Sequence, residues 1–152
     1  MENKIIIFTL EERKYALHLN NVLKVIQSVD ITPLPEISDI ILGVIDYHSE
    51  ILPVVNLRKK LSFQDKQVDL NDLFILLQTK NLKTVLIADS IYGIIDYDED
   101  LLKAIDENIL KPEYLKGTLT IENEIVLIYD LEKFLNLEEE QRIKNALLNL
   151  NN

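Results

Sequence analysis

The sequence predicts an all-β protein built from two small five-stranded barrels, because an internal repeat covers most of the chain and consists of short apolar segments. When Gly43 is aligned with Gly117, residues 40–61 and 114–135 match without a gap. The matching pairs include Glu50 with Glu124, Ile51 with Ile125, Leu57 with Leu131, Lys59 with Lys133 and Leu61 with Leu135. The upstream parts repeat as well, since residues 5–8 match residues 74–77 and residues 16–22 match residues 85–91. Such a repeat predicts two related lobes rather than one large sheet.

Composition narrows the class of protein. The chain has 152 residues, 47% of them hydrophobic, which is enough for a single domain over 1–152 with a substantial core. The formal net charge of −10 argues against binding to nucleic acid or to anionic lipid. There is no cysteine, so disulfides, thiol catalysis and cysteine-ligated metals are excluded. Neither a signal peptide nor a membrane span is expected, and we expect the protein to be cytoplasmic.

Lobe one is expected over about residues 4–63. Its five strands are predicted, from apolar or alternating runs, at 4–10, 14–19, 22–27, 42–47 and 51–57. Pro33 and Pro35 indicate an extended connector before the fourth strand. Pro53 lies within the fifth, which predicts an edge or bulged strand because proline donates no hydrogen bond. A single helical turn is expected at 57–61.

A polar linker at 64–72 should lead to lobe two, over about 73–136. Its strands are predicted at 73–79, 83–88, 91–95, 117–121 and 124–130, with a helical turn near 100–105 in the connector. Five short strands per lobe favour closure into a barrel, which removes exposed edges. A C-terminal amphipathic helix is predicted at 138–150, because apolar residues recur at helical spacing behind three glutamates.

No catalytic centre is evident. The chain holds two histidines, of which His18 alternates with leucines in a predicted strand and is expected to point outward, whereas His48 lies at a hairpin tip. With only three glycines, a glycine-rich phosphate loop is nearly excluded, and no nucleophile-elbow motif occurs. We therefore predict that the protein is not an enzyme and needs no cofactor.

One acidic cluster is an alternative of a different class. Asp96, Asp98 and Asp100 alternate, and Glu107 stands where a calcium-binding EF-hand loop places its last ligand. Leu101, however, occupies the position that needs glycine for the sharp turn. A solvated acidic connector is the better interpretation, and a small metal-binding protein or enzyme using these aspartates remains the competing hypothesis.

Several segments resemble the CheW-like domain family over about residues 5–136. The matching stretches are Ile31-Thr32-Pro33-Leu34-Pro35, Gly43-Val44-Ile45, Ile51-Leu52-Pro53-Val54, Leu57-Arg58, Asp89-Ser90-Ile91 and Asp130-Leu131-Glu132-Lys133. The resemblance implies two pseudo-symmetric, SH3-like five-stranded barrels. It also implies a non-catalytic adaptor that bridges the cytoplasmic tip of a chemoreceptor and the regulatory domain of the histidine kinase CheA.

The same resemblance suggests which residues make these contacts. Receptor binding is expected from Val22, Lys24, Tyr47, His48, Ser49 and Glu50. Kinase binding is expected from apolar side chains on a barrel surface, including Tyr92 and Ile94.

The chain departs from the family pattern at the receptor side. The family usually has glutamate, arginine and glycine where this chain has Lys24, His48 and Ser49, and it usually has a second-lobe glycine where this chain has Val85. An alternative is therefore an accessory or divergent scaffold in a non-motility signalling array, with altered or no receptor binding.

Overall fold

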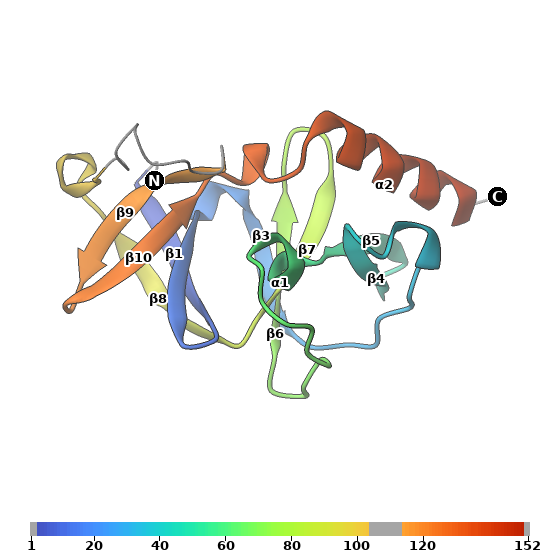
Figure 1. Ribbon diagram of the computed structural model, residues 1–152, viewed down its shortest axis with the longest axis horizontal. Coiled ribbons are helices and arrows are strands. Elements are labelled where there is room, and N and C mark those ends of the chain that lie inside the picture. The colour runs from blue at the N-terminus through green and yellow to red at the C-terminus, as the bar shows by residue number, and fades with distance from the viewer. Residues whose placement is uncertain (1–2, 104–113, 151–152) are drawn as a thin grey trace. The chain divides into compact units, whose positions relative to one another are not determined.

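The computed structural model of the chain describes residues 3–103 and 114–150, which form two five-stranded mixed sheets with short helices (Figure 1). The strands are β1 (Lys4–Leu10), β2 (Arg13–His18), β3 (Val22–Gln27), β4 (Ile41–Tyr47), β5 (Glu50–Val55), β6 (Leu73–Gln78), β7 (Lys83–Ala88), β8 (Ser90–Asp96), β9 (Leu115–Ile121) and β10 (Glu124–Tyr129). The α-helices are α1 (Leu57–Lys60) and α2 (Leu137–Leu150), and the 3₁₀ turns are η1 (Leu19–Asn21), η2 (Pro35–Ile37), η3 (Glu99–Leu101) and η4 (Leu131–Lys133). The predicted β-rich fold class and most strand bounds are confirmed.

The two sheets divide the chain differently from the sequential lobes 4–63 and 73–136. Sheet A has the order β8-β1-β2-β10-β9, and sheet B has the order β3-β6-β7-β5-β4. Unit 1 accordingly takes its described residues from within 1–22 and 88–134, and unit 2 from within 23–87 and 135–152. Each sheet therefore combines strands from both halves of the repeat, and the segment 64–72 belongs to unit 2.

A parallel pairing produces this exchange in unit 1. β10 runs parallel to β2, with Val126 opposite Lys14 and Tyr129 opposite Leu17. β1 and β9 then flank this pair in antiparallel register, and β8 adds to the free side of β1. Figure 1 shows β1, β8, β9 and β10 close together in this unit.

Each unit has its own apolar core. In unit 1 the inward faces of the strands bury Ile5, Ile7, Ala16, Leu119, Val126 and Ile128, together with Tyr97 from the segment after β8. In unit 2 one cluster holds Ile45, Leu52, Val54, Phe74, Leu76 and Val85. Burial of these side chains is the main stabilising term for both units.

Three two-residue hairpin turns use side chains where glycine is usual. Both central residues have positive φ at Glu11-Glu12 (51° and 66°), His48-Ser49 (50° and 68°) and Glu122-Asn123 (51° and 65°). Two positive φ values define the type I′ turn, whose twist matches that of the flanking strands. Residues other than glycine are strained there, so these turns are held by the strands that they join.

The expectation of an edge strand at Pro53 is wrong. β5 lies between β7 and β4 in sheet B, and Pro53 is buried opposite Val44. The missing N–H is tolerated because β5 and β7 share one registered pair, Val54 with Val85. The irregularity predicted for this hairpin lies in β4, where the register shifts between Ile41 and Gly43.

Gly43 is required at that shift. Its φ is 152°, and a Cβ there would lie 2.2 Å from the carbonyl oxygen of Thr32. The connector before β4 passes this close because Thr32 and Val44 exchange two backbone hydrogen bonds of 2.8 Å. No side chain larger than hydrogen fits without moving one of the two backbones.

The C-terminal helix is confirmed as α2 and belongs to unit 2. Asn136 and Glu139 form a reciprocal capping box, in which each backbone N–H donates to the other's side-chain oxygen, at 3.0 and 2.7 Å. Ile143 is fully buried against Ile37, Ile40, Ile41 and Leu82. Arg142 adds two bonds to the Asp39 carboxylate, which hold the pKa of that carboxyl below its usual value.

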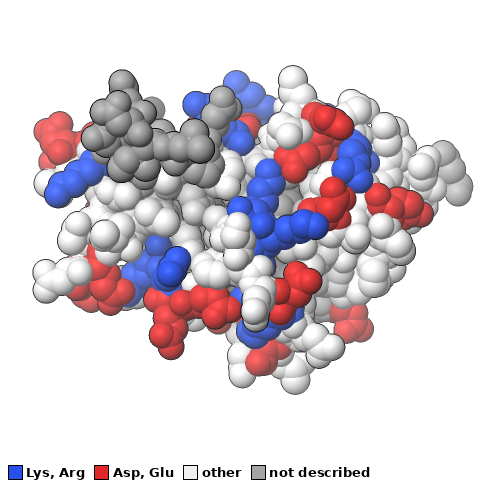
Figure 2. Space-filling view, viewed as in Figure 1, with Lys and Arg blue, Asp and Glu red and all other residues white. Residues whose placement is uncertain are grey.

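The surface carries charges of both signs. On the face drawn in Figure 2, acidic and basic side chains are interspersed. Among the helices of the described residues, none has the length and apolar character needed to cross a membrane.

Candidate protein-interaction surfaces

The first candidate surface is β8, which forms one end of the strand order in sheet A. Exposure alternates along this strand: Tyr92 and Ile94 are 40% and 55% exposed, whereas Ile91, Gly93 and Ile95 are half-buried. A residue is added to β8 where the register shifts opposite Ile7 and Phe8, which leaves Tyr92 without a registered partner. Two large side chains are thus presented to solvent on a strand whose backbone is anchored by β1.

The Tyr92 ring is fixed by charged neighbours. Its hydroxyl donates a 2.6 Å hydrogen bond to Oε2 of Glu122, from the β9–β10 turn. That carboxylate raises the pKa of the Tyr92 phenol, with smaller effects from burial and from Glu124. The Lys14 ammonium lies 4.7 Å from the ring centroid and pairs with Glu124. We name Tyr92 and Ile94, with this rim of Lys14, Glu122 and Glu124, the β8 surface.

The second candidate surface is the β4–β5 tip, residues 47–50 in unit 2. The Tyr47 ring is half-buried on the core cluster and meets the exposed His48 ring edge-on, with 4.3 Å between centroids. Glu50 accepts two hydrogen bonds from Nζ of Lys83, at 3.1 and 3.0 Å. Ser49 is exposed at the second positive-φ position, so the tip presents a histidine and a serine on a constrained turn.

Val22 and Lys24 lie on β3, where Val22 is half-buried and Lys24 is exposed. The order of sheet B puts β6, β7 and β5 between β3 and β4. Hydrogen-bonded neighbours along the sheet therefore do not bring Lys24 next to the β4–β5 tip. The structure brings Tyr47, His48, Ser49 and Glu50 together as one turn, and it brings Tyr92 and Ile94 together on one strand.

Sequence reasoning missed the charged rim of the β8 surface. Glu122-Asn123 is a polar pair between two strands, and that pattern predicts a hairpin tip. Which strand lies beside this hairpin tip depends on the strand order of sheet A, and the local sequence pattern does not predict that order. The pattern around Lys14 likewise indicates only a polar residue of a strand. Its contact with Tyr92 becomes evident once β2 and β8 are placed in the same sheet.

The acidic connector is accounted for by local contacts in its described part. Asp96 forms a 3.3 Å ion pair with Lys4, and Asp98 accepts a 3.0 Å hydrogen bond from the Asp100 backbone N–H. Glu107 lies outside the described residues. Across residues 3–103 and 114–150, no group of three or more histidine or acidic side chains is arranged to hold a metal ion.

His18 ends β2 and is half-buried rather than fully outward. Its Nε2 lies 3.0 Å from Nζ of Lys116, and its ring centroid lies 6.1 Å from that of Tyr97. These contacts join the ends of strands within unit 1.

A β-rich chain whose distinctive exposed features are an apolar edge strand and a constrained turn belongs to the class of protein-interaction modules. Residues 4–142 match the CheW-like domain family, and the chain belongs to this family. It is therefore a non-catalytic scaffold protein of the CheW family, whose members couple chemoreceptors to CheA in chemotaxis.

Curated relatives agree over nearly their full length. The chain is 25% identical to the chemotaxis protein CheW of Thermotoga maritima over 96% of this chain and 94% of that protein. It is 22% identical to CheW of Treponema pallidum, over 93% and 87%, and 23% identical to CheW of Bacillus subtilis, over 91% and 90%. The crystal structure of the scaffolding protein TtCheW from Thermoanaerobacter tengcongensis has the same fold, with a TM-score of 0.80, 24% identity and 91% coverage of each chain.

Proposed function

We propose that this chain links two partners through separate surfaces. The β8 surface binds the regulatory domain of CheA, and β3 together with the β4–β5 tip binds the cytoplasmic tip of a chemoreceptor. Membership of the CheW-like family supports the pair of partners, and the observation that carries the proposal is the exposed Tyr92–Ile94 pair on an anchored strand.

The β8 surface has the composition of a signalling contact. Such contacts combine a small apolar centre with a polar rim that stays partly hydrated. Here Tyr92 and Ile94 supply the centre, and Lys14, Glu122 and Glu124 supply the rim. Because the tyrosine is already held by Glu122, little side-chain freedom remains to be lost when a partner binds.

On the receptor side the charges have changed relative to the family pattern. Lys24 is exposed and cationic where the family usually has glutamate, and His48 stands where it usually has arginine. Histidine lacks the bidentate guanidinium fork, so a planar carboxylate contact is lost. We propose that the matching receptor tip is more acidic than usual opposite Lys24. A cytoplasmic location accompanies this proposal, since both proposed partners lie there.

Reconstitution tests the proposal. Purified protein would be combined with CheA and with a receptor cytoplasmic fragment encoded by the same genome, and autophosphorylation of CheA would be followed with and without the fragment. We expect the receptor fragment to change kinase activity only when this chain is present. Kinase activity that responds to the receptor equally without the chain contradicts the adaptor role.

A second candidate function is an accessory scaffold that binds CheA without binding a receptor. The observation that favours it is the combined change at Lys24, His48 and Ser49, all exposed on the proposed receptor side. Calorimetric titration separates the two functions. Binding to CheA together with no heat on addition of any receptor fragment of that genome would select the accessory role.

A further inference from the structure

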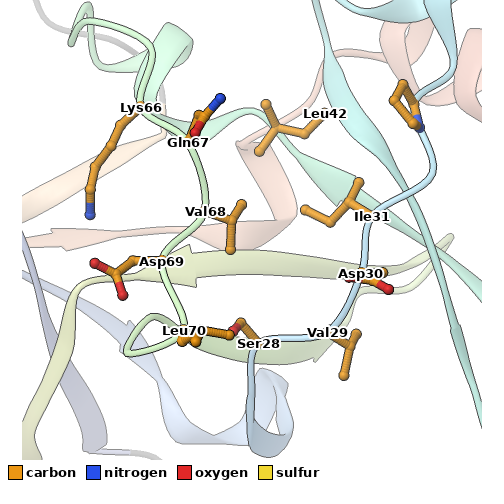
Figure 3. Close-up of a pocket in the computed structure, with 11 residues that line it drawn as sticks. Ser28, Val29, Asp30, Ile31, Leu42, Lys66, Gln67, Val68, Asp69 and Leu70 are labelled. Carbon is orange, nitrogen blue, oxygen red and sulfur yellow. The ribbon is translucent and has the colours of Figure 1, made fainter.

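A groove opens in unit 2 where two extended segments separate from each other. β3 and β6 are neighbours in sheet B, and just past β3 the backbone N–H of Ser28 donates a 3.2 Å bond to the carbonyl of Asp72. Beyond this bond, residues 28–33 and 66–70 diverge and leave a groove of about 730 Å³ between them (Figure 3). The groove therefore lies directly beyond the paired part of β3, where residues 28–33 and 66–70 are no longer paired with each other.

The backbone on both sides of the groove is available for pairing. Residues 29–31 and 67–68 belong to no strand or helix. In the part of the chain that the structure describes, their N–H and C=O groups form no hydrogen bond with another protein group. Extended segments with unpaired backbone groups are the usual template for adding a strand from another chain.

The groove floor is apolar and fixed. Ile31 and Leu42 both pack against the buried cluster of unit 2. Val68, 39% exposed, faces them from the segment 66–70, and Figure 3 shows these three side chains directed toward the gap. A partner side chain placed every second residue along an added strand would point at this floor.

The rim is acidic. Asp30 and Asp69 are exposed on opposite segments, and Lys66, the basic residue of the lining, forms a 3.5 Å ion pair with Asp72. The lining therefore holds two exposed carboxylates, whereas its one ammonium group is already paired with the buried Asp72. Complementary charge selects among partners and speeds their approach, so a cationic segment is favoured.

We propose that this groove binds an extended segment of a partner protein in which apolar residues alternate with lysine or arginine. The segment adds as a strand between residues 28–33 and 66–70, with its apolar side chains on Ile31, Leu42 and Val68 and its cations near Asp30 and Asp69. This site shares no residue with the proposed receptor and kinase surfaces, although residues 28–33 directly follow β3, and its test does not depend on either surface.

The probe is a capped heptapeptide that alternates valine with lysine, titrated into the isotope-labelled full chain and followed by amide NMR shifts. We expect shifts concentrated at residues 28–33 and 66–70. Two matched peptides separate the contribution of backbone hydrogen bonds from that of charge. In the first, N-methylation of alternate residues removes backbone donors, and in the second, replacement of each lysine by glutamate reverses the charge. Each should weaken binding at least about tenfold. Equal binding of the N-methylated peptide, or shifts centred elsewhere, would overturn the proposal.

Protein variants give the second measurement. Val68→Asp places a charge on the groove floor, and Asp30→Lys reverses a charge on the groove rim. Each variant should therefore bind the valine–lysine peptide at least about tenfold more weakly. Leu148→Asp is the matched control, because Leu148 is a 62% exposed residue on α2, outside the groove. Because Val68, Asp30 and Leu148 are exposed to solvent, we expect all three variants to fold. Circular dichroism checks this expectation. Unchanged affinity of folded Val68→Asp, or equal loss in Leu148→Asp, refutes the site.

Discussion

Tyr92 and Glu122 are joined by a 2.6 Å hydrogen bond that ties the exposed strand β8 to the β9–β10 turn. The bond joins residues thirty positions apart within unit 1, since Glu122 is carried by the type I′ turn between β9 and β10. The carboxylate thereby orients the phenol. An exposed aromatic side chain held in this way is suited to serve as a binding anchor.

Ile94→Asp should weaken binding to the regulatory domain of CheA by about tenfold or more, because it places a charge at the apolar centre of the β8 surface. Ile94 is 55% exposed, so the variant should remain folded. Isothermal titration calorimetry measures the affinity. Ile125→Asp is the matched control: Ile125 is a 65% exposed isoleucine on β10 of the same sheet. Full affinity in folded Ile94→Asp would show that the kinase binds elsewhere.

The double change Lys24→Glu with His48→Arg should weaken binding to the native receptor by about threefold to tenfold while CheA binding stays unchanged. It restores the charges usual in the family and so removes the cation that we propose faces an acidic receptor tip. Affinity would be measured at one fixed salt concentration, because exposed charges are screened. Lys144→Glu on α2 serves as the charge-reversal control. Equal receptor affinity in parent and double mutant would indicate that these substitutions lie on an unused surface.

Gly43→Ala should lower the free energy of unfolding by about 2–4 kcal/mol or prevent folding, because the new Cβ would overlap the Thr32 carbonyl and the backbone has positive φ. Gly93→Ala is the matched control, since a Cβ at Gly93 meets nothing within 4 Å. Urea denaturation of both variants checks the difference. Similar stability of the two alanine variants would mean that the connector at Thr32 moves aside freely.

Ser49→Gly should raise the free energy of unfolding by about 0.5–1 kcal/mol, because glycine takes the φ of 68° in the β4–β5 turn without steric strain. The matched control is Ser90→Gly, which puts glycine in a strand and should be destabilising. Thermal and urea unfolding would both be measured. A loss of stability in Ser49→Gly contradicts the strain argument, and a change in receptor affinity would assign the Ser49 side chain a contact.

Arg142→Gln should make the free energy of unfolding less dependent on pH in the acid range. The Arg142 guanidinium lowers the pKa of Asp39, so ionised Asp39 stabilises the fold above its ordinary pKa of about 4. That stabilisation is lost as the pH falls through the lowered folded-state pKa. NMR titration should show a higher Asp39 pKa in Arg142→Gln and no change in Lys144→Gln. An unchanged Asp39 pKa in both would show that the ion pair is not maintained in solution.

The helices, the strands and the general chemistry of the chain follow from the order of its residues alone. Short apolar runs specify most strands to within a residue or two, helical spacing specifies α2, and the lack of catalytic motifs excludes an obvious active site. The family resemblance also identified Tyr92 and Ile94 as surface candidates, and both are exposed. These properties depend mainly on residues that are close in the sequence, so they can be predicted from the sequence pattern.

Which strands share a sheet depends on contacts between distant parts of the chain. β1–β2 and β6–β7 carry the same repeated pattern, so no local signal says which of them joins β8–β10. That choice depends on the long-range parallel pairing of β2 with β10, which also brings Lys14 to Glu124. Lys14 lies over Tyr92 because β1 pairs with both β2 and β8. The interior position of Pro53 and the open gap between residues 28–33 and 66–70 likewise follow from packing between distant segments. Periodicity fixes which face of a strand is buried, but not which strand covers it.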